Sequence, residues 1–166
     1  MTGKKNILFI CTGNSARSIM AEGIFNSLSN GRYTGFSAGS TPTGTPHPMA
    51  VKTLEKFGID SGFARSKSWD EYSADNKNAP NIDLVVTVCG NAADEICPIW
   101  QSQEQATMQT HWGMEDPAKF EGSVVMQQAR FDTVFSILRK RIKAFLAHQD
   151  MPQDQQVLDD IGKISI

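Results

Sequence analysis

The sequence predicts an α/β protein in which four parallel strands form a doubly wound sheet, in the order 2-1-3-4, with flanking helices. Two observations support this class. Apolar runs of strand length alternate with segments of helical periodicity, and polar loops follow the strands directly. Alternating strands and helices favour parallel βαβ units with right-handed crossovers. Because ligands bind beyond the carboxyl ends of such strands, functional residues are expected in the loops that follow them.

The first half of the chain predicts two strands, each followed by a helix. Residues 6–10 predict a short buried strand, and the next apolar residues recur at helical spacing: Met20, Ile24 and Leu28. Asn30 and Gly31 supply the stop of this helix. The second strand is expected over residues 33–38, and the second helix over about residues 48–57.

The second half predicts two further strands and a long helix. The strongest strand signal is residues 82–88, because a near-continuous apolar run is typical of a strand covered on both faces. Residues 106–112 predict a weaker strand, and an amphipathic helix is expected from about residue 123 to residue 148. We expect one domain over residues 1–149 and a C-terminal tail over residues 150–166.

Composition disfavours several classes of function. The 166 residues include 16 Lys and Arg against 18 Asp and Glu, a formal net charge of −2. This balance provides no basic patch for nucleic acid or for an anionic membrane. The apolar runs are far shorter than the roughly 20 residues of a membrane span, and the N-terminus lacks a signal peptide's apolar region. We expect a cytoplasmic monomer that binds neither nucleic acid nor membranes.

The three cysteines, Cys11, Cys89 and Cys97, are too few and odd in number for a secreted disulfide framework. Cys11 and Cys89 directly follow predicted strands, and residues 111–116 follow a third. The carboxyl ends of parallel strands meet at one edge, so these segments should face one crevice. No metal is expected, because the cysteine spacings lack the paired knuckles of a zinc site.

Residues 11–17 place a thiol, five residues and a guanidinium at a strand-to-helix junction. A loop there aims backbone N–H groups inward at a helix N-terminus, which predicts a cradle for a tetrahedral oxyanion made by Thr12, Gly13, Asn14, Ser15, Ala16 and Arg17. Arg17 can bind two oxygens with its forked N–H groups. The positive charge of Arg17 and the partial charge of the helix N-terminus should ease ionisation of the Cys11 thiol and make it a nucleophile. Ser18 can donate a hydrogen bond to the resulting thiolate. A buried structural cysteine before an ordinary helix start is the alternative.

These residues resemble a known family. Residues 11–18, followed by residues 20–23, resemble the anion-binding loop of the low-molecular-weight phosphotyrosine phosphatase superfamily. Other similar segments lie between residues 4 and about 147, namely 36–39, 86–89, 97–99, 111–113 and 116–118. Cys89 and Cys97, together with His111-Trp112-Gly113, point to the thioredoxin-coupled arsenate reductases within it. The resemblance implies the fold of this superfamily and the reduction of arsenate.

The resemblance also implies a thiol relay with no bound cofactor. Cys11 attacks arsenate, Cys89 attacks Cys11 and releases arsenite, and Cys97 takes over Cys89 to leave a redox-active disulfide. An external thiol reductant, thioredoxin or a glutaredoxin–glutathione couple, would reduce that disulfide. Asp116 is implied as the general acid for the leaving oxygen, with Glu115 as the fallback. Phosphate and sulfate are expected to bind as analogues of arsenate.

Four departures from the resemblance stand out. The chain has Ala16 where the reductases often carry Cys, and one extra residue between Cys89 and Cys97. Its C-terminal tail extends past the usual family end. Lys67 stands where some members place a carboxylate that helps bind potassium near Asn14, Glu22 and Ser37. Because an ammonium there could replace the cation, we expect no potassium requirement.

Two other functions remain open. Hydrolysis of phosphotyrosine would use the same loop and Asp116, but it requires an aromatic-lined slot for the substrate ring. The family usually supplies a Tyr just after the Asp-Pro pair, where this chain has Ala118. A non-enzymatic phosphate or phosphopeptide binder would need neither an acid nor a second thiol.

Overall fold

The sheet has the predicted strand order. The computed structural model describes residues 4–89, 99–102 and 106–165. Its four parallel strands lie in the order β2-β1-β3-β4, with bounds β1 Lys5–Cys11, β2 Tyr33–Gly39, β3 Leu84–Thr87 and β4 Met108–His111. Each strand matches a predicted one to within two residues at either end. The predicted order 2-1-3-4 is therefore confirmed.

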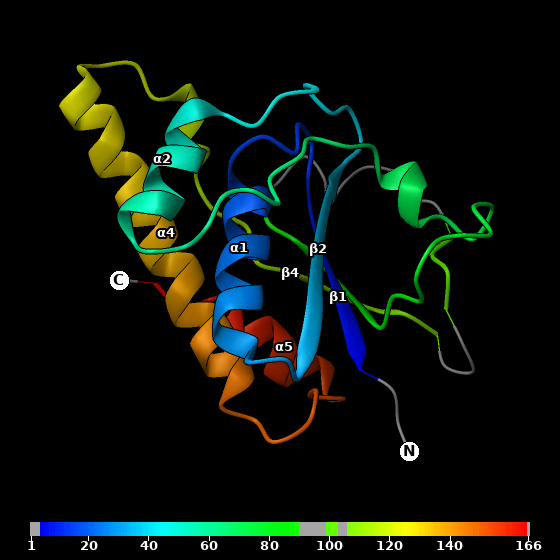
Figure 1. Ribbon diagram of the computed structural model, residues 1–166. Coiled ribbons are helices and arrows are strands. Elements are labelled where there is room, and N and C mark those ends of the chain that lie inside the picture. The colour runs from blue at the N-terminus through cyan, green and yellow to red at the C-terminus, as the bar shows by residue number, and fades with distance from the viewer. Residues whose placement is uncertain (1–3, 90–98, 103–105, 166) are drawn as a thin grey trace.

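Three helices gather on one side of the sheet, as Figure 1 shows: α1 Arg17–Ser29, α2 Pro48–Lys56 and α4 Val124–Leu146. The connection to β3 carries a short 3-10 helix, η1 Trp69–Tyr72, and runs on the other side. α1 ends where expected, because Asn30 adopts a left-handed conformation with φ 51°. Within the described ranges, no helix is long and apolar enough to cross a membrane.

Aromatic side chains connect the sheet to these helices. Phe9 of β1 and Phe25 of α1 pack edge to face with ring centroids 5.5 Å apart, and Phe25 lies 5.8 Å from Phe145 of α4. All three side chains are at most 1% exposed. Full burial of such a side chain stabilises a fold by about 1.5–3 kcal/mol. This cluster packs β1, in the interior of the sheet, against α1 and through Phe25 against α4.

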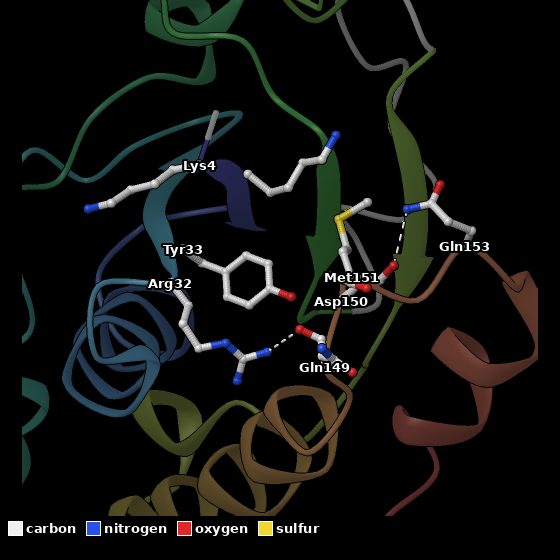
Figure 2. Close-up of a pocket in the computed structure, with 8 residues that line it drawn as sticks. Lys4, Arg32, Tyr33, Gln149, Asp150, Met151 and Gln153 are labelled. Carbon is white, nitrogen blue, oxygen red and sulfur yellow. Dashed lines mark hydrogen bonds between the residues drawn. The ribbon is translucent and has the colours of Figure 1, made fainter. Parts of the chain in front are cut away.

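A cavity of about 630 Å³ lies at the amino ends of β1 and β2. Figure 2 shows Arg32 and Tyr33 on one side of it and Gln149, Asp150, Met151 and Gln153 on the other. Arg32 donates hydrogen bonds to the carbonyl groups of Leu146, His148 and Gln149 at 2.9, 2.7 and 2.7 Å. The guanidinium therefore fastens the end of α4 and the residues after it to the start of β2, far from the carboxyl ends of the strands.

The C-terminal tail contains a short helix, α5 Gln155–Ile161, which the sequence analysis did not anticipate. Its residues pack on the edge strand β4: Gln155 donates to the Gln109 carbonyl at 2.8 Å, and Thr110 donates to the Asp159 carboxylate at 2.8 Å. The tail thus covers an edge that would otherwise present unpaired backbone groups. The division into a domain of residues 1–149 and a tail stays a prediction.

Gly162 is predicted to be required for docking of the tail. A Cβ at this position would lie 2.5 Å from the Trp112 ring and 2.7 Å from the His111 carbonyl oxygen. Gly162→Ala should therefore lower the free energy of unfolding by about 1–3 kcal/mol, the usual cost of overpacking. Urea denaturation measures this change. The exposed neighbour variant Lys163→Ala should stay within about 0.5 kcal/mol of the wild type. Equal stability of the two variants would contradict the steric argument.

Candidate active site

The loop of residues 11–17 connects β1 to α1, and its carbonyl groups are bound from outside. Thr41 donates to the Thr12 carbonyl at 2.9 Å, Thr43 to Gly13 at 3.0 Å, and His47 to Ser15 at 2.8 Å. Among the residues that the structure describes, none accepts a hydrogen bond from the amide groups of residues 13–17. These N–H groups at a helix N-terminus are thus free to bind an oxyanion.

Gly39 permits the close approach of this loop to β2. It lies beside Cys11 in the register of the two strands. A Cβ on Gly39 would come within 2.5 Å of the Thr12 carbonyl oxygen and 2.9 Å of the Asn14 amide nitrogen. Since both of these are backbone atoms, a side chain at this position would displace the loop itself.

Asn14 holds the loop from the inside. Its backbone is left-handed with φ 44°, which asparagine tolerates better than most residues. Its fully buried side chain donates to the Ser18 and Ser37 hydroxyl groups at 2.8 and 3.1 Å and accepts from the Lys67 amide at 2.9 Å. These contacts tie the loop to α1, to β2 and to the main chain at Lys67.

Cys11 lies at the base of the loop, 3% exposed, with its Sγ 2.9 Å from the Ser18 hydroxyl oxygen. Burial raises the pKa of the Cys11 thiol, while hydrogen bonds with Ser18 and the charge of Arg17 lower it by less. The described geometry therefore opposes the ease of ionisation expected from the sequence. The physical reason is desolvation, which outweighs the nearby positive charge.

Arg17 and Asp116 face each other across the site. Arg17 Nη2 lies 3.3 Å from Asp116 Oδ2, and Arg17 Nη1 donates to the Met114 carbonyl at 2.9 Å. Asp116 also caps the 3-10 helix η2 (Pro117–Lys119) by accepting from the Ala118 amide at 3.0 Å. Glu115 instead pairs with Arg130 at 2.8 Å. Of the two candidate acids, only Asp116 lines the cavity over Cys11.

That cavity has a volume of about 230 Å³ and is lined by Cys11, Thr12, Gly13, Ser15, Ala16, Arg17, Thr43, Asp116 and Lys119. No aromatic side chain is among these lining residues, so the space suits a small oxyanion better than an aryl ring. The sequence analysis missed Thr43 and Lys119. The position of Lys119, three residues after Asp116, offered a signal, whereas Thr43 lies in a turn-rich stretch that offered none.

Cys89 lies against the same loop. The Thr12 amide donates to Cys89 Sγ at 3.3 Å, and the Thr12 hydroxyl lies 3.6 Å from that sulfur. Cys89 is 2% exposed and, like Cys11, forms no disulfide. The chain thus brings two predicted site cysteines together where β1 and β3 end. The third, Cys97, lies outside the described residues.

Lys67 occupies a buried polar cluster behind the loop. Its Nζ donates to the Ser37 hydroxyl at 3.2 Å and lies 3.6 Å from Glu22 Oε1. Burial raises the pKa of Glu22 and lowers that of Lys67, and their mutual attraction opposes both shifts. The ammonium therefore lies where it was expected to replace a cation. The absence of a potassium requirement stays a prediction.

Among the described residues, no group of three His, Cys, Asp or Glu side chains is placed to hold a metal ion. The candidate site instead consists of the buried Cys11 thiol at the base of the loop, the Asp116 carboxylate that lines the cavity over it, and the second thiol of Cys89.

These features define a class. The sequence model of the low molecular weight phosphotyrosine protein phosphatase family matches residues 6–157 of this chain. The chain belongs to this family. Within it, the chain is similar to proteins named arsenate reductase. One from Halalkalibacterium halodurans is 41% identical over 142 residues, which are 86% of this chain and 95% of that protein. One from Bacillus subtilis is 39% identical over 141 residues, 85% and 94% of the two chains.

Solved structures agree with both levels of this grouping. A structure described as an arsenate reductase in the phosphate binding state has a TM-score of 0.67 and 29% identity, covering 86% of this chain and 97% of the other. A low molecular weight protein tyrosine phosphatase from T. tengcongensis has a TM-score of 0.62 and 26% identity, covering 84% and 96%.

Ser18 is predicted to lower the pKa of Cys11. Ser18→Ala removes the hydroxyl 2.9 Å from Cys11 Sγ, so the thiol pKa should rise further. Alkylation of Cys11 across a pH series, measured by mass spectrometry of the peptide that contains it, reports this pKa. In Ser18→Ala the alkylation should begin at a higher pH than in the wild type. Ser27→Ala, on the exposed face of the same helix, is the matched control. An unchanged pH profile in Ser18→Ala would show that the contact does not stabilise the thiolate.

Proposed function

We propose that the protein is an arsenate reductase that reduces arsenate to arsenite through Cys11, Cys89 and Cys97. The single observation that carries this proposal is the second buried thiol: Cys89 accepts a hydrogen bond from the loop that surrounds Cys11. A phosphatase needs only the first thiol. The relatives at about 40% identity that are named arsenate reductase support the same function.

In the first step, Cys11 Sγ attacks the arsenic atom, a sulfur–arsenic bond forms, and one arsenic–oxygen bond breaks. The free amide groups of residues 13–17 and the guanidinium of Arg17 stabilise the negative charge on the remaining oxygens. Asp116, which lines the cavity opposite Cys11, donates the proton with which the oxygen leaves as water. Ser18 stabilises the attacking thiolate.

In the second step, Cys89 Sγ attacks Cys11 Sγ. A Cys11–Cys89 disulfide forms, and the electron pair of the broken sulfur–arsenic bond leaves with arsenic, which departs as arsenite. A disulfide requires Cα atoms roughly 4.4–6.8 Å apart. The position of Cys89 Sγ, 3.3 Å from the amide nitrogen of Thr12, the residue after Cys11, supports this step.

In the third step, Cys97 attacks Cys89 and frees Cys11, and an external thiol reductant reduces the Cys89–Cys97 disulfide. We propose thioredoxin, with a glutaredoxin–glutathione couple as the alternative. No cofactor is then bound. Support comes from the likeness in fold to a Corynebacterium glutamicum protein described as a thioredoxin-dependent arsenate reductase (TM-score 0.56, 24% identity, covering 86% of this chain and 63% of that one).

The proposal extends to the domain, the oligomeric state, the location and the competing anions of the protein. Residues 1–149 form the catalytic domain, the protein acts as a cytoplasmic monomer, and phosphate or sulfate competes with arsenate for the loop. Competition follows from shape and charge, because all three are tetrahedral oxyanions that the same N–H groups can bind.

Phosphotyrosine hydrolysis is the second candidate, because Cys11, Arg17 and Asp116 would serve it equally well. Arsenite production with thioredoxin, thioredoxin reductase and NADPH, measured beside hydrolysis of an aryl phosphate, separates the two functions. Cys11→Ser should abolish both activities, and Cys89→Ser should abolish only arsenite production. Turnover of the aryl phosphate alone by the wild type would overturn the proposal. Binding of phosphate without either turnover would leave a non-enzymatic binder.

Asp116 is predicted to be the general acid. Asp116→Asn cannot donate the proton to the leaving oxygen, and it should slow the first step by about 10²–10⁴-fold. The rate of Cys11–Cys89 disulfide formation in a Cys97→Ser background, followed by rapid quenching after one equivalent of arsenate, measures this step. Glu115→Gln is the control, since Glu115 pairs with Arg130 outside the cavity. A loss of rate that follows Glu115 instead would reassign the acid.

The order of the relay is predicted to be visible in trapped species. Cys89→Ser should leave the arsenic adduct on Cys11, because no second thiol can displace it. Cys97→Ser should stop after one turnover with a Cys11–Cys89 disulfide. Peptide mapping by mass spectrometry after one equivalent of arsenate identifies both species. Continued turnover of Cys97→Ser with thioredoxin would remove Cys97 from the mechanism.

A further inference from the structure

Helix α4 contains a buried arginine, Arg141, to which the proposed mechanism assigns no role. Arg141 is only 5% exposed, although its neighbours Lys140 and Lys143 are exposed. It shares the inner face of the helix with Leu138 and Phe145, which are three and four residues away. Because a guanidinium stays charged in proteins, its burial is costly unless its N–H groups are bound.

The partners of Arg141 among the described residues are all main-chain carbonyl groups. Its Nη1 donates to Trp112 at 2.8 Å and reaches Gly113 at 3.3 Å, and its Nε donates to Ile164 at 2.9 Å. Within the described part of the chain, no carboxylate forms an ion pair with it. The side chain thus joins the segment after β4 to the C-terminal tail.

The segment that Arg141 binds leads directly to Asp116. The next carbonyl along the chain, that of Met114, accepts a hydrogen bond from Arg17 at 2.9 Å. Three consecutive carbonyl groups, of residues 112–114, are therefore bound by two arginines, one on α4 and one at the anion-binding loop. This arrangement fixes the main chain two residues before the carboxylate that faces Arg17.

The tail completes the arrangement. Ile164 supplies one of the carbonyl groups around Arg141, and Leu158 accepts from Trp112 Nε1 at 3.0 Å. The other end of the tail is fastened by Arg32, which Figure 2 shows directed at Gln149. The family match ends at residue 157, so the Ile164 contact lies beyond it. The contact is thus a feature of this chain's own C-terminal segment.

We propose that Arg141 is a positioning residue, which holds the segment 112–114 between the C-terminal tail and Arg17 so that Asp116 faces the leaving oxygen. Arg141 touches neither substrate nor the reacting atoms and acts through the main chain before Asp116. This inference rests on the proposed acid role of Asp116. Lysine cannot replace it fully, because a single ammonium lacks the fork that reaches two segments at once.

The test compares Arg141→Met, which keeps an apolar side chain of similar length, with Lys140→Met on the exposed face of the same helix. The readouts, all in a Cys97→Ser background, are the rate of Cys11–Cys89 disulfide formation after one equivalent of arsenate, its pH profile, and the dissociation constant of inorganic phosphate. Arg141→Met should slow the rate by about tenfold or more, part of the general-acid contribution. Phosphate binding should change less than about threefold, and Lys140→Met should match the wild type in all three.

A double variant distinguishes positioning from general loss of structure. If Arg141 acts through Asp116, Arg141→Met in an Asp116→Asn background should cost no further rate, and both single variants should share one altered pH profile. Additive losses, or weakened phosphate binding with an unchanged pH profile, would overturn the proposal. Arg141→Lys should recover part of the rate, and it replaces Arg141→Met in these measurements if the latter does not fold.

Failure of this inference differs visibly from failure of the proposed function. A normal rate in Asp116→Asn would remove the acid role and the positioning role with it. A slow Asp116→Asn beside an Arg141→Met variant that equals Lys140→Met would remove only the positioning role.

Discussion

The hydrogen-bonded pairing of β1 with a parallel strand on each side places the loop after β1, with Cys11, next to Gly39 and Cys89. Pairing with β2 sets Gly39 beside Cys11, and only glycine leaves room there for the loop that follows. Pairing with β3 sets Thr87 beside Ile10, so that Cys89 reaches the Thr12 amide. A shift of one residue in either pairing would separate these groups, because successive side chains in a strand point to opposite faces.

The site is built from buried polar groups, and burial of the apolar core supplies the free energy that offsets the cost of burying them. Cys11, Asn14, Glu22, Lys67 and Arg141 are all less than 9% exposed. Each is bound by hydrogen bonds or an opposite charge, which offsets the loss of hydration without eliminating it. Burial therefore does two things at once, since it fixes the geometry of the loop and raises the pKa of the Cys11 thiol. The hydroxyl of Ser18 is the nearest group that opposes this shift.

The sheet was predictable because its signals are local. Residues 82–88 form an apolar run that can be buried on both faces, and the observed strand Leu84–Thr87 lies within them. Helix α1 begins at Arg17, the last residue of the predicted loop, because this loop leads into the helix without a separating turn. The sequence analysis missed helix α5 because its signal is not local. Its seven residues have a weak pattern and acquire their structure from packing on β4.

The sequence by itself determined the residue types and spacing of the loop from Cys11 to Arg17, since a thiol, backbone amides and a guanidinium act within one short segment. Tertiary structure alone separates Asp116 from Glu115: they are neighbours in the chain, yet Asp116 lines the cavity over Cys11 beside Arg17, whereas Glu115 pairs with Arg130. It also brought in Lys119 and gave the buried Arg141 its partners. Such choices depend on segments far apart in sequence, and hydrophobic periodicity contains no information about which carbonyl or carboxylate a long side chain will reach once the helices pack.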